Sequence, residues 1–287
     1  MITSDFTGNL GNHLFQYVTT RSIAERKGYE WGFTKYIYGD YFGGKSQMDF
    51  LDVDYGKQPV IGIDKEFKET IVNIDGHTNV HLYDTFNGLK DNSKLFGCWQ
   101  TEQYFEKEKV RDWLKIKSIE NYDRNFRKNL NENTCVLNIR GGEYRGIGAV
   151  ILPQSYWINA INYMKSINKN MSFIIVTDDL QYAQALLPGF NCFHSGIDVD
   201  YYMINKASWL ILSNSSFAWF PAWLNSNVKM TIAPKYWARY NTSDGYWASS
   251  NIFTKGWTYL NREGNLENYD QIIEQLKDSK YRCMYNI

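Results

Sequence analysis

The second half of the chain alternates between short apolar runs and helical patterns, and this constrains the fold more than any other feature. Residues 134–139 indicate a buried strand before a Gly-Gly pair, and residues 153–167 indicate a helix opened by Pro153. The pattern then repeats, with strands expected at 173–176, 209–212 and 230–233 and helices expected up to about 187, over about 200–207 and over about 217–224. Such repeats predict parallel βαβ units and an α/β fold.

The first half is less regular. Residues 8–12, Gly-Asn-Leu-Gly-Asn, indicate a turn-rich loop, and we expect a helix from about His13 to Gly28. Residues 102–116 indicate another helix. Apolar residues recur at 266, 269, 273 and 276, which predicts an amphipathic helix at the end of the chain.

The polar stretch 121–133 marks the domain boundary that we expect. This gives an N-terminal α/β domain over 1–133 and a C-terminal Rossmann-like domain with its terminal helix over 134–287. Ligands of such sheets bind outside the carboxyl ends of the strands, so we expect a site in the crevice between the two halves.

Charge and composition exclude several classes of protein. The 287 residues carry 31 basic and 31 acidic side chains, which argues against a protein that neutralises nucleic-acid phosphates. No run reaches the ~18 apolar residues of a membrane span, and the N-terminus lacks the layout of a secretory signal. Four scattered cysteines without a CxxC pair and four histidines argue against a disulfide scaffold or a metal centre. We therefore expect a cytoplasmic protein.

Aromatic residues make up 17% of the chain. Sugars present apolar C–H faces that stack on aromatic rings, so this content fits a carbohydrate-handling protein. It equally fits an aromatic-rich core.

Two glycine-containing segments suggest binding of an anion. The loop 8–12 leads into a helix whose exposed N–H groups favour a negative charge, although a plain strand–helix turn has the same sequence. In residues 138–145, Arg140 follows a strand and can form a forked contact with a diphosphate. The alternative is a surface Arg–Glu pair in a glycine turn.

Polar residues also follow two other strands. Residues 213–217, Ser-Asn-Ser-Ser-Phe, can cap a helix and also present hydroxyl and N–H groups to a phosphate. Asp178 and Asp179 can accept ribose hydroxyls or a guanine N–H edge, or serve as a helix cap and first-turn acid. The DxD strings at 52–54 and 198–200 are short enough to arise by chance, although DxD can hold a divalent ion.

Together, these segments resemble the α-1,2-fucosyltransferase family, glycosyltransferase family 11. Four blocks carry the resemblance in order across roughly residues 1–237. In the first half, GNLGNHLFQY at 8–17 resembles GGLGNQLFQYA, and LFGCWQTEQYF at 95–105 resembles GYWQSEKYF. In the second half, NIRGGEY at 138–144 resembles HIRRGDY, and DYYM at 200–203 with SNSSFAWFPAWL at 213–224 resembles DLYLM with NSSFSWWAAWL.

The resemblance implies a GT-B-like fold of two facing Rossmann-type domains, with the donor bound by the C-terminal one. It implies inverting transfer of fucose from GDP-fucose to a glycan hydroxyl without a metal or other cofactor. It also assigns Asp200 to a helix start rather than to a metal site. The acceptor glycan and the oligomeric state stay open.

The implied site has three groups of residues. Arg140 and Glu143 are the expected catalytic residues, with Arg140 on the β-phosphate and Glu143 as either the base or a residue that holds Arg140. The expected donor-binding residues are Asn138, Gly142, Arg145, Asp178, Asn214, Ser215, Ser216 and Phe217. The expected residues that orient donor or acceptor are Gly11, Asn12, His13 and Gln100.

The signature departs from the family pattern at three positions. The family's His, second Arg and Asp are here Asn138, Gly141 and Glu143. Losing one charged hydrogen bond weakens diphosphate binding by about 1.5–3 kcal/mol, and we expect Arg145 to supply the missing charge. The altered signature leaves two alternatives, transfer of a different nucleotide-activated sugar or a non-catalytic carbohydrate-binding homologue.

Overall fold

A computed structural model describes residues 1–33, 47–73, 79–81, 83–237 and 252–277. The chain forms two compact units, Met1–Lys117 and Ser118–Ile287. Each unit is built around its own parallel sheet. The second unit carries the more complete version of the strand–helix alternation seen in the sequence.

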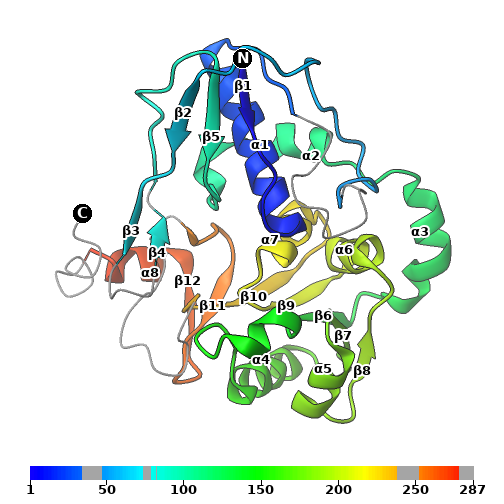
Figure 1. Cartoon of the computed structure of the whole chain (residues 1–287). Helices are drawn as coiled ribbons and strands as arrows, with labels where there is room; N and C mark the ends of the chain where they lie inside the picture. Colours follow the sequence, from blue (N-terminus) through cyan, green and yellow to red (C-terminus); the bar gives the residue numbers. More distant parts are fainter. Residues whose placement is uncertain (34–46, 74–78, 82, 238–251, 278–287) are drawn as a thin grey trace. The chain divides into compact units, whose positions relative to one another are not determined.

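The sheet of the second unit has the strand order β12-β11-β10-β9-β6-β7-β8 (Figure 1). Its strands are β6 (Thr134–Ile139), β7 (Ser172–Thr177), β8 (Asn191–Phe193), β9 (Trp209–Leu212), β10 (Met230–Pro234), β11 (Thr258–Leu260) and β12 (Leu266–Asn268). Neighbouring strands are parallel except β12, which runs antiparallel to β11. All three predicted strand positions after β6 are confirmed, and β8, β11 and β12 are additional.

Helices cover both faces of this sheet. They are α3 (Ile119–Phe126), α4 (Gln154–Ile167), α5 (Leu180–Leu186), α6 (Ile197–Lys206), α7 (Ser216–Leu224) and α8 (Tyr269–Gln275). Helices α4 and α5 lie on one face, and α6 and α7 lie on the other (Figure 1). Alternate β6 residues Cys135, Leu137 and Ile139 pack with Trp157 and Ile161 of α4 in one buried cluster. Burial of both faces explains why β6 is apolar almost throughout.

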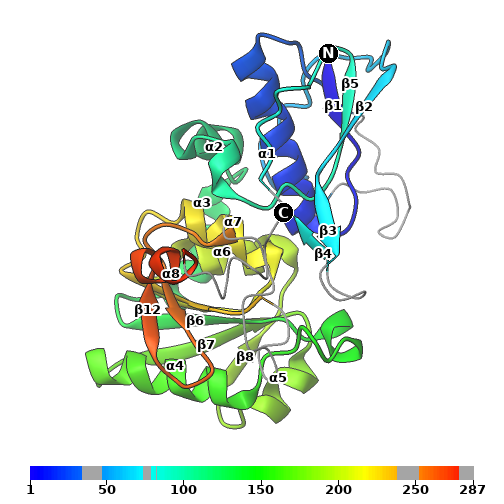
Figure 2. The same ribbon diagram turned by 90° about the vertical axis from the view of Figure 1, so that its left-hand side faces the viewer.

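The first unit has a smaller parallel sheet in the order β1-β5-β2. Its elements are β1 (Ile2–Ser4), α1 (Leu10–Lys27), β2 (Lys65–Lys68), β3 (Ile71–Asn73), β4 (Asn79–His81), β5 (Ser93–Phe96), the 3-10 helix η1 (Glu102–Tyr104) and α2 (Lys107–Trp113). Helix α1 runs alongside this sheet (Figure 2). It begins at Leu10, earlier than predicted, and ends as predicted at Gly28, whose φ of 71° is left-handed.

The single helix predicted over 102–116 is wrong. Thr101 caps the short helix η1 by accepting the N–H of Gln103. Phe105 then takes an extended conformation, with φ −146° and ψ 164°, before α2 begins. The buried Phe105 ring contacts Phe15 of α1 at a centroid distance of 6.3 Å, so burial of an aromatic side chain interrupts the helical pattern.

The polar stretch 121–133 is helical up to Asn129 and belongs to the second unit. The compact units divide between residues 117 and 118, earlier than the boundary expected at 133. Helix α3 and the 3-10 helix η2 (Arg127–Asn129) occupy much of it. Tyr122 stacks on Tyr202 of α6 at 5.5 Å and donates a hydrogen bond to Asp198 at 2.9 Å. Contacts of Tyr122 therefore pack α3 against α6, although the sequence of α3 is mostly polar.

The C-terminal helix is confirmed only from Tyr269 onward. Leu266, expected on that helix, instead lies in β12, opposite Leu260 of β11. Asn268 begins α8 with a capping box that pairs it with Gln271. The end of the chain, including Cys283, lies outside the described residues. Among the described helices, none is long and apolar enough to cross a bilayer.

Candidate active site

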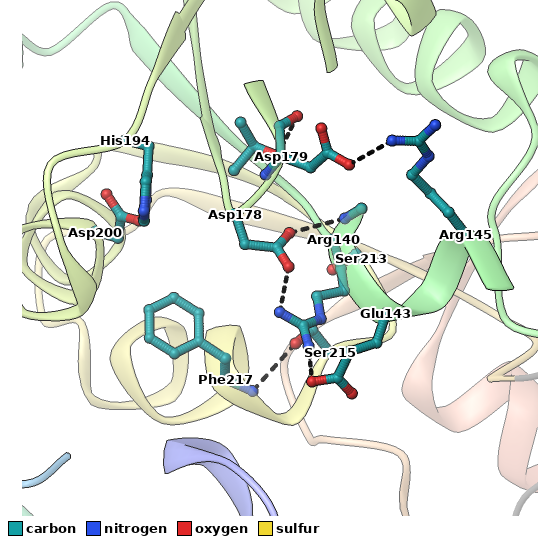
Figure 3. Close-up of polar contacts among 12 residues, drawn as sticks. Arg140, Glu143, Arg145, Asp178, Asp179, His194, Asp200, Ser213, Ser215 and Phe217 are labelled. Atoms are coloured by element: carbon teal, nitrogen blue, oxygen red, sulfur yellow. Dashed lines mark hydrogen bonds and ion pairs between the residues drawn. The ribbon is translucent and has the colours of Figure 1, made fainter. Parts of the chain in front are cut away.

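Polar side chains gather at the carboxyl edge of the second unit's sheet (Figure 3). Because β6 pairs with β7 on one side and β9 on the other, the residues that follow these three strands emerge side by side. These residues are Arg140 after β6, Asp178 after β7 and Ser213 after β9. The edge of an α/β sheet is the usual ligand position, and the structure brings the predicted donor-binding segments together there.

One carboxylate organises the loop after β6. Asp178 is ion-paired with the Arg140 guanidinium, and its second oxygen accepts the Gly141 N–H at 2.8 Å. Asp178 is therefore not the helix-capping acid that the sequence allowed. It fixes both the backbone and the charged side chain of the signature loop.

The two glycines of this loop leave no space for side chains. A Cβ at Gly141 would lie 2.6 Å from the Cβ of Asp179 and 2.9 Å from Tyr182, and one at Gly142 would lie 2.4 Å from Asp178. Gly142 also has a φ of 30°. An arginine at position 141, as in the family pattern, is therefore incompatible with this arrangement of Asp179 and Tyr182.

Arg145 interacts with those same two residues. Its guanidinium is 3.0 Å from the Asp179 carboxylate and lies over the Tyr182 ring at 5.8 Å. Asp179 is also the N-cap of α5, where it accepts the Tyr182 N–H at 3.0 Å. This backbone bond, together with Arg145, holds the pKa of Asp179 below its ordinary value.

Glu143 lies in the short 3-10 helix η3 (Gly142–Gly146), with its side chain 69% exposed. Its carboxylate is 3.4 Å from Arg140, whose guanidinium also lies over Tyr144 at 5.3 Å. The expectation that Glu143 holds Arg140 agrees with this contact. The exposed carboxylate is also accessible to an acceptor hydroxyl.

The segment after β9 is bound to the signature loop through buried polar groups. Ser213 donates its hydroxyl to Asn138 at 2.8 Å and its backbone N–H to the Asn138 carbonyl at 3.0 Å. Ser215 is the N-cap of α7 and accepts the N–H of Phe217 at 3.3 Å. Ser216 is the first residue of α7. The predicted strand, polar turn and helix are thus all present.

Asn214 anchors this turn to more distant segments. Its side-chain amide donates to the carbonyls of Val150, at 3.0 Å, and Trp237. Its Oδ1 atom is buried and accepts no hydrogen bond among the described residues.

A His–Asp pair lies at the same edge and was not among the predicted site residues. His194, which follows β8, is 2.7 Å through Nδ1 from the Asp200 carboxylate. Asp200 lies in the first turn of α6, as the resemblance implied, and is buried. Burial raises the pKa of Asp200 to about 6, and His194 opposes part of this rise. The two residues are six positions apart, and the sequence drew attention only to the aspartate, through the DxD string and the DYYM block.

The first unit contains the remaining predicted residues. Gln100 donates from Nε2 to the Asn12 Oδ1 at 2.8 Å, joining two segments that are far apart in sequence. Gly11, Asn12 and His13 lie in the first turn of α1. His13 is buried, and this burial lowers its pKa to about 4, with the Gly8 backbone opposing part of the shift.

Two further residues, Gln16 and Glu69, were not among the predicted site residues, although Gln16 lies in the block at 8–17. Gln16 donates to the Gly97 carbonyl at 3.1 Å and to the Thr7 hydroxyl at 2.8 Å. Glu69 accepts the N–H groups of Cys98 and Trp99. Across the described residues, no group of three His, Cys, Asp or Glu side chains is placed to hold a metal ion.

Comparisons with known proteins identify relatives of this chain. Residues 76–261 match the model of the family described as glycosyl transferase family 11. The chain is 25% identical over 271 residues to an alpha-1,2-colitosyltransferase from Escherichia coli, covering 83% of this chain and 92% of that protein. It is 30% identical over 122 residues to the O-antigen biosynthesis glycosyltransferase WbnK from Escherichia coli, covering 37% and 40% of the two chains.

The fold is similar to that of the fucosyltransferase NodZ from Bradyrhizobium, with a TM-score of 0.51 and 12% identity over 81% of this chain and 94% of that one. This similarity confirms the predicted α/β, GT-B-like fold class. The family match spans both the Trp-Gln block and the signature loop at the sheet edge. The chain belongs to glycosyl transferase family 11 and is a glycosyltransferase.

Proposed function

We propose that this enzyme transfers fucose from GDP-fucose to a hydroxyl of a glycan, with inversion at the anomeric carbon. The observation that carries the proposal is the position of Arg140, at the carboxyl edge of the parallel sheet and next to the turn that begins α7. A guanidinium and a helix start together suit a diphosphate. NodZ, which has a similar fold, was studied after soaking with GDP-fucose, so this donor is the first to test.

The donor's charge is bound by the second unit in this proposal. Arg140 binds the β-phosphate and stabilises the departing GDP, and Arg145 supplies the second positive charge. Asn138, Gly142, Asp178 and the turn at 214–217 complete the donor site. Both arginines are also paired with carboxylates, so a bound phosphate would compete with these carboxylates for the guanidinium groups or share them.

The transfer step forms one glycosidic bond, breaks one bond between the sugar and the diphosphate, and moves one proton. The acceptor oxygen attacks the anomeric carbon, the bond from that carbon to the β-phosphate oxygen breaks, and GDP leaves with the electron pair. Glu143 takes the acceptor's proton in this scheme, and its exposed carboxylate next to Arg140 supports that role. In the first unit, Gly11, Asn12, His13 and Gln100 orient donor or acceptor.

A second candidate is transfer of colitose, because an alpha-1,2-colitosyltransferase is similar over most of the chain. The same edge of the sheet would bind that donor's nucleotide diphosphate, and the difference would lie in the sugar pocket. We further propose that catalysis needs no metal ion and that the enzyme acts in the cytoplasm, consistent with free Cys98, Cys135 and Cys192.

A thermal-shift screen tests the donor. GDP, UDP, CMP, GDP-fucose and GDP-mannose are each compared with and without EDTA. A ligand at ~100 times its Kd stabilises the folded state by about 2.7 kcal/mol. We expect stabilisation by GDP and GDP-fucose that EDTA does not change. Stronger stabilisation by another nucleotide would overturn the proposal that GDP-fucose is the donor. Loss of the stabilisation with EDTA would overturn the proposal that no metal ion is needed.

The Arg140→Ala variant tests the mechanism. We expect turnover to fall by about 100-fold or more, since the leaving diphosphate loses its charged hydrogen bond. Arg124→Ala, which removes an exposed arginine of α3, is the matched control. Near-normal turnover in a folded Arg140→Ala protein would remove the central claim.

A further inference from the structure

The turn that carries Gln100 is shaped by a buried carboxylate. Glu69 follows β2 and is 6% exposed. Its Oε2 accepts the Cys98 N–H at 2.6 Å, and its Oε1 accepts the Trp99 N–H at 3.1 Å. Successive backbone N–H groups that converge in this way form an anion-binding nest, and here the anion is a side chain of the same unit.

The backbone of this turn needs such support. Trp99 is fully buried with a φ of 56°, a left-handed conformation that is unfavourable for a bulky residue. A Cβ at Gly97 would lie 2.5 Å from the Glu69 Cβ and 2.6 Å from its Oε2, so the carboxylate fits only against a glycine. The two charged hydrogen bonds offset the strain at Trp99.

The orientation of Gln100 follows from this turn. Gln100 is the next residue after Trp99, and its Nε2 donates to Asn12 at 2.8 Å. The Asn12 amide nitrogen in turn lies against Gly8, where a Cβ would be 2.4 Å away. A rotation of the backbone at Trp99 would therefore move the Gln100 amide away from Asn12.

We propose that Glu69 is a positioning residue for sugar transfer, acting through the Gln100–Asn12 amide pair. This inference rests on the proposed role of that pair in orienting donor or acceptor. In this proposal Glu69 acts on the backbone of the turn and does not contact substrate. Nucleotide binding belongs to the other unit in the proposed function, so Glu69 should affect turnover and leave GDP affinity unchanged.

The test compares Glu69→Gln with Glu66→Gln. The amide retains only one acceptor oxygen and places an NH2 group against a backbone N–H. We expect kcat to fall about tenfold or more, because a misplacement near 1 Å has large effects on transfer, with the Kd for GDP unchanged. Glu66, on the preceding strand β2, is 58% exposed, and its variant should retain wild-type kcat.

A double-mutant cycle separates positioning from general loss of structure. If Glu69 acts through Gln100, then Glu69→Gln combined with Gln100→Ala is no slower than Gln100→Ala alone. The inference would be overturned if the two losses in kcat multiplied in the double variant, or if Glu69→Gln kept the wild-type kcat. If circular dichroism shows that Glu69→Gln does not fold, Glu69→Asp, which keeps the charge with a shorter reach, replaces it in the same cycle.

The cycle also separates this inference from the proposed function. If Gln100→Ala transfers sugar at the wild-type rate, the proposed role of the amide pair fails, and the inference fails with it. If Gln100→Ala is slow while Glu69→Gln matches the Glu66→Gln control, only the inference about Glu69 fails.

Discussion

Asp178 binds the Arg140 guanidinium and the Gly141 N–H with its two oxygens. The Asp178 carboxylate thus pairs with the same guanidinium that, in the proposed mechanism, binds the donor's phosphate. With Glu143 and Asp179 nearby, the cluster has two guanidinium groups and three carboxylates. This edge of the sheet is therefore a cluster of mixed charge rather than a purely basic pocket.

Asp178→Asn should tighten binding of inorganic pyrophosphate. The amide oxygen can still accept the Gly141 N–H, while the competing charge on Arg140 is removed. We expect Kd to fall threefold to tenfold, a change of ~1 kcal/mol, in calorimetric titrations at fixed ionic strength. Asp198→Asn removes an equal charge from α6 and is the control. Weaker binding than in that control would mean that Asp178 itself contributes to binding.

Arg145→Ala should weaken GDP binding by about tenfold, equivalent to ~1.4 kcal/mol. The physical reason is that Gly141 has no side chain and Arg145 is the remaining cation beside Asp179 and Tyr182. Arg145→Lys keeps the charge and should recover part of the affinity. Unchanged affinity in Arg145→Ala, measured beside Arg124→Ala, would exclude Arg145 from the donor site.

His13→Gln should make folding stability less dependent on pH. The pKa of His13 is lowered from 6.5 to about 4 by burial, so between these values the unfolded chain binds more protons than the folded one. Stability contributed by neutral His13 is present above pH 6.5 and is lost as the pH falls toward 4, by on the order of 3 kcal/mol. Urea unfolding from pH 7 to 4.5 measures this loss. An equal loss in wild type and His13→Gln would contradict the assignment.

Glu267→Gln should destabilise the second unit. Lys235, directly after β10, is buried with its ammonium 2.6 Å from the Glu267 carboxylate of β12. Breaking such a pair leaves an uncompensated buried charge, and we expect the free energy of unfolding to fall by about 3 kcal/mol. Glu263→Gln changes an exposed carboxylate of the same hairpin and should cost about 0.5 kcal/mol or less. Equal urea midpoints for the two variants would show that the ion pair contributes nothing.

The βαβ order could be predicted from sequence because each of its elements has a local cause. The strand 134–139 is buried on both faces and therefore mostly apolar, and helix α4 begins directly after Pro153. The same local logic located Arg140 and the Ser215 cap. Elements stabilised by distant partners were missed or misassigned, including α3, which is docked by tyrosine contacts to α6, and β12, which pairs with β11.

The sequence by itself therefore determined the fold class, the family and which segments carry polar groups at strand ends, because these depend on periodicity and short motifs. Only the tertiary structure decided how those groups pair. Asp178 with Arg140, Arg145 with Asp179, and Glu69 with the turn before Gln100 each join residues about 30 or more positions apart. Such pairings depend on strand register and on the space left by Gly97 and Gly141, and no local pattern records either.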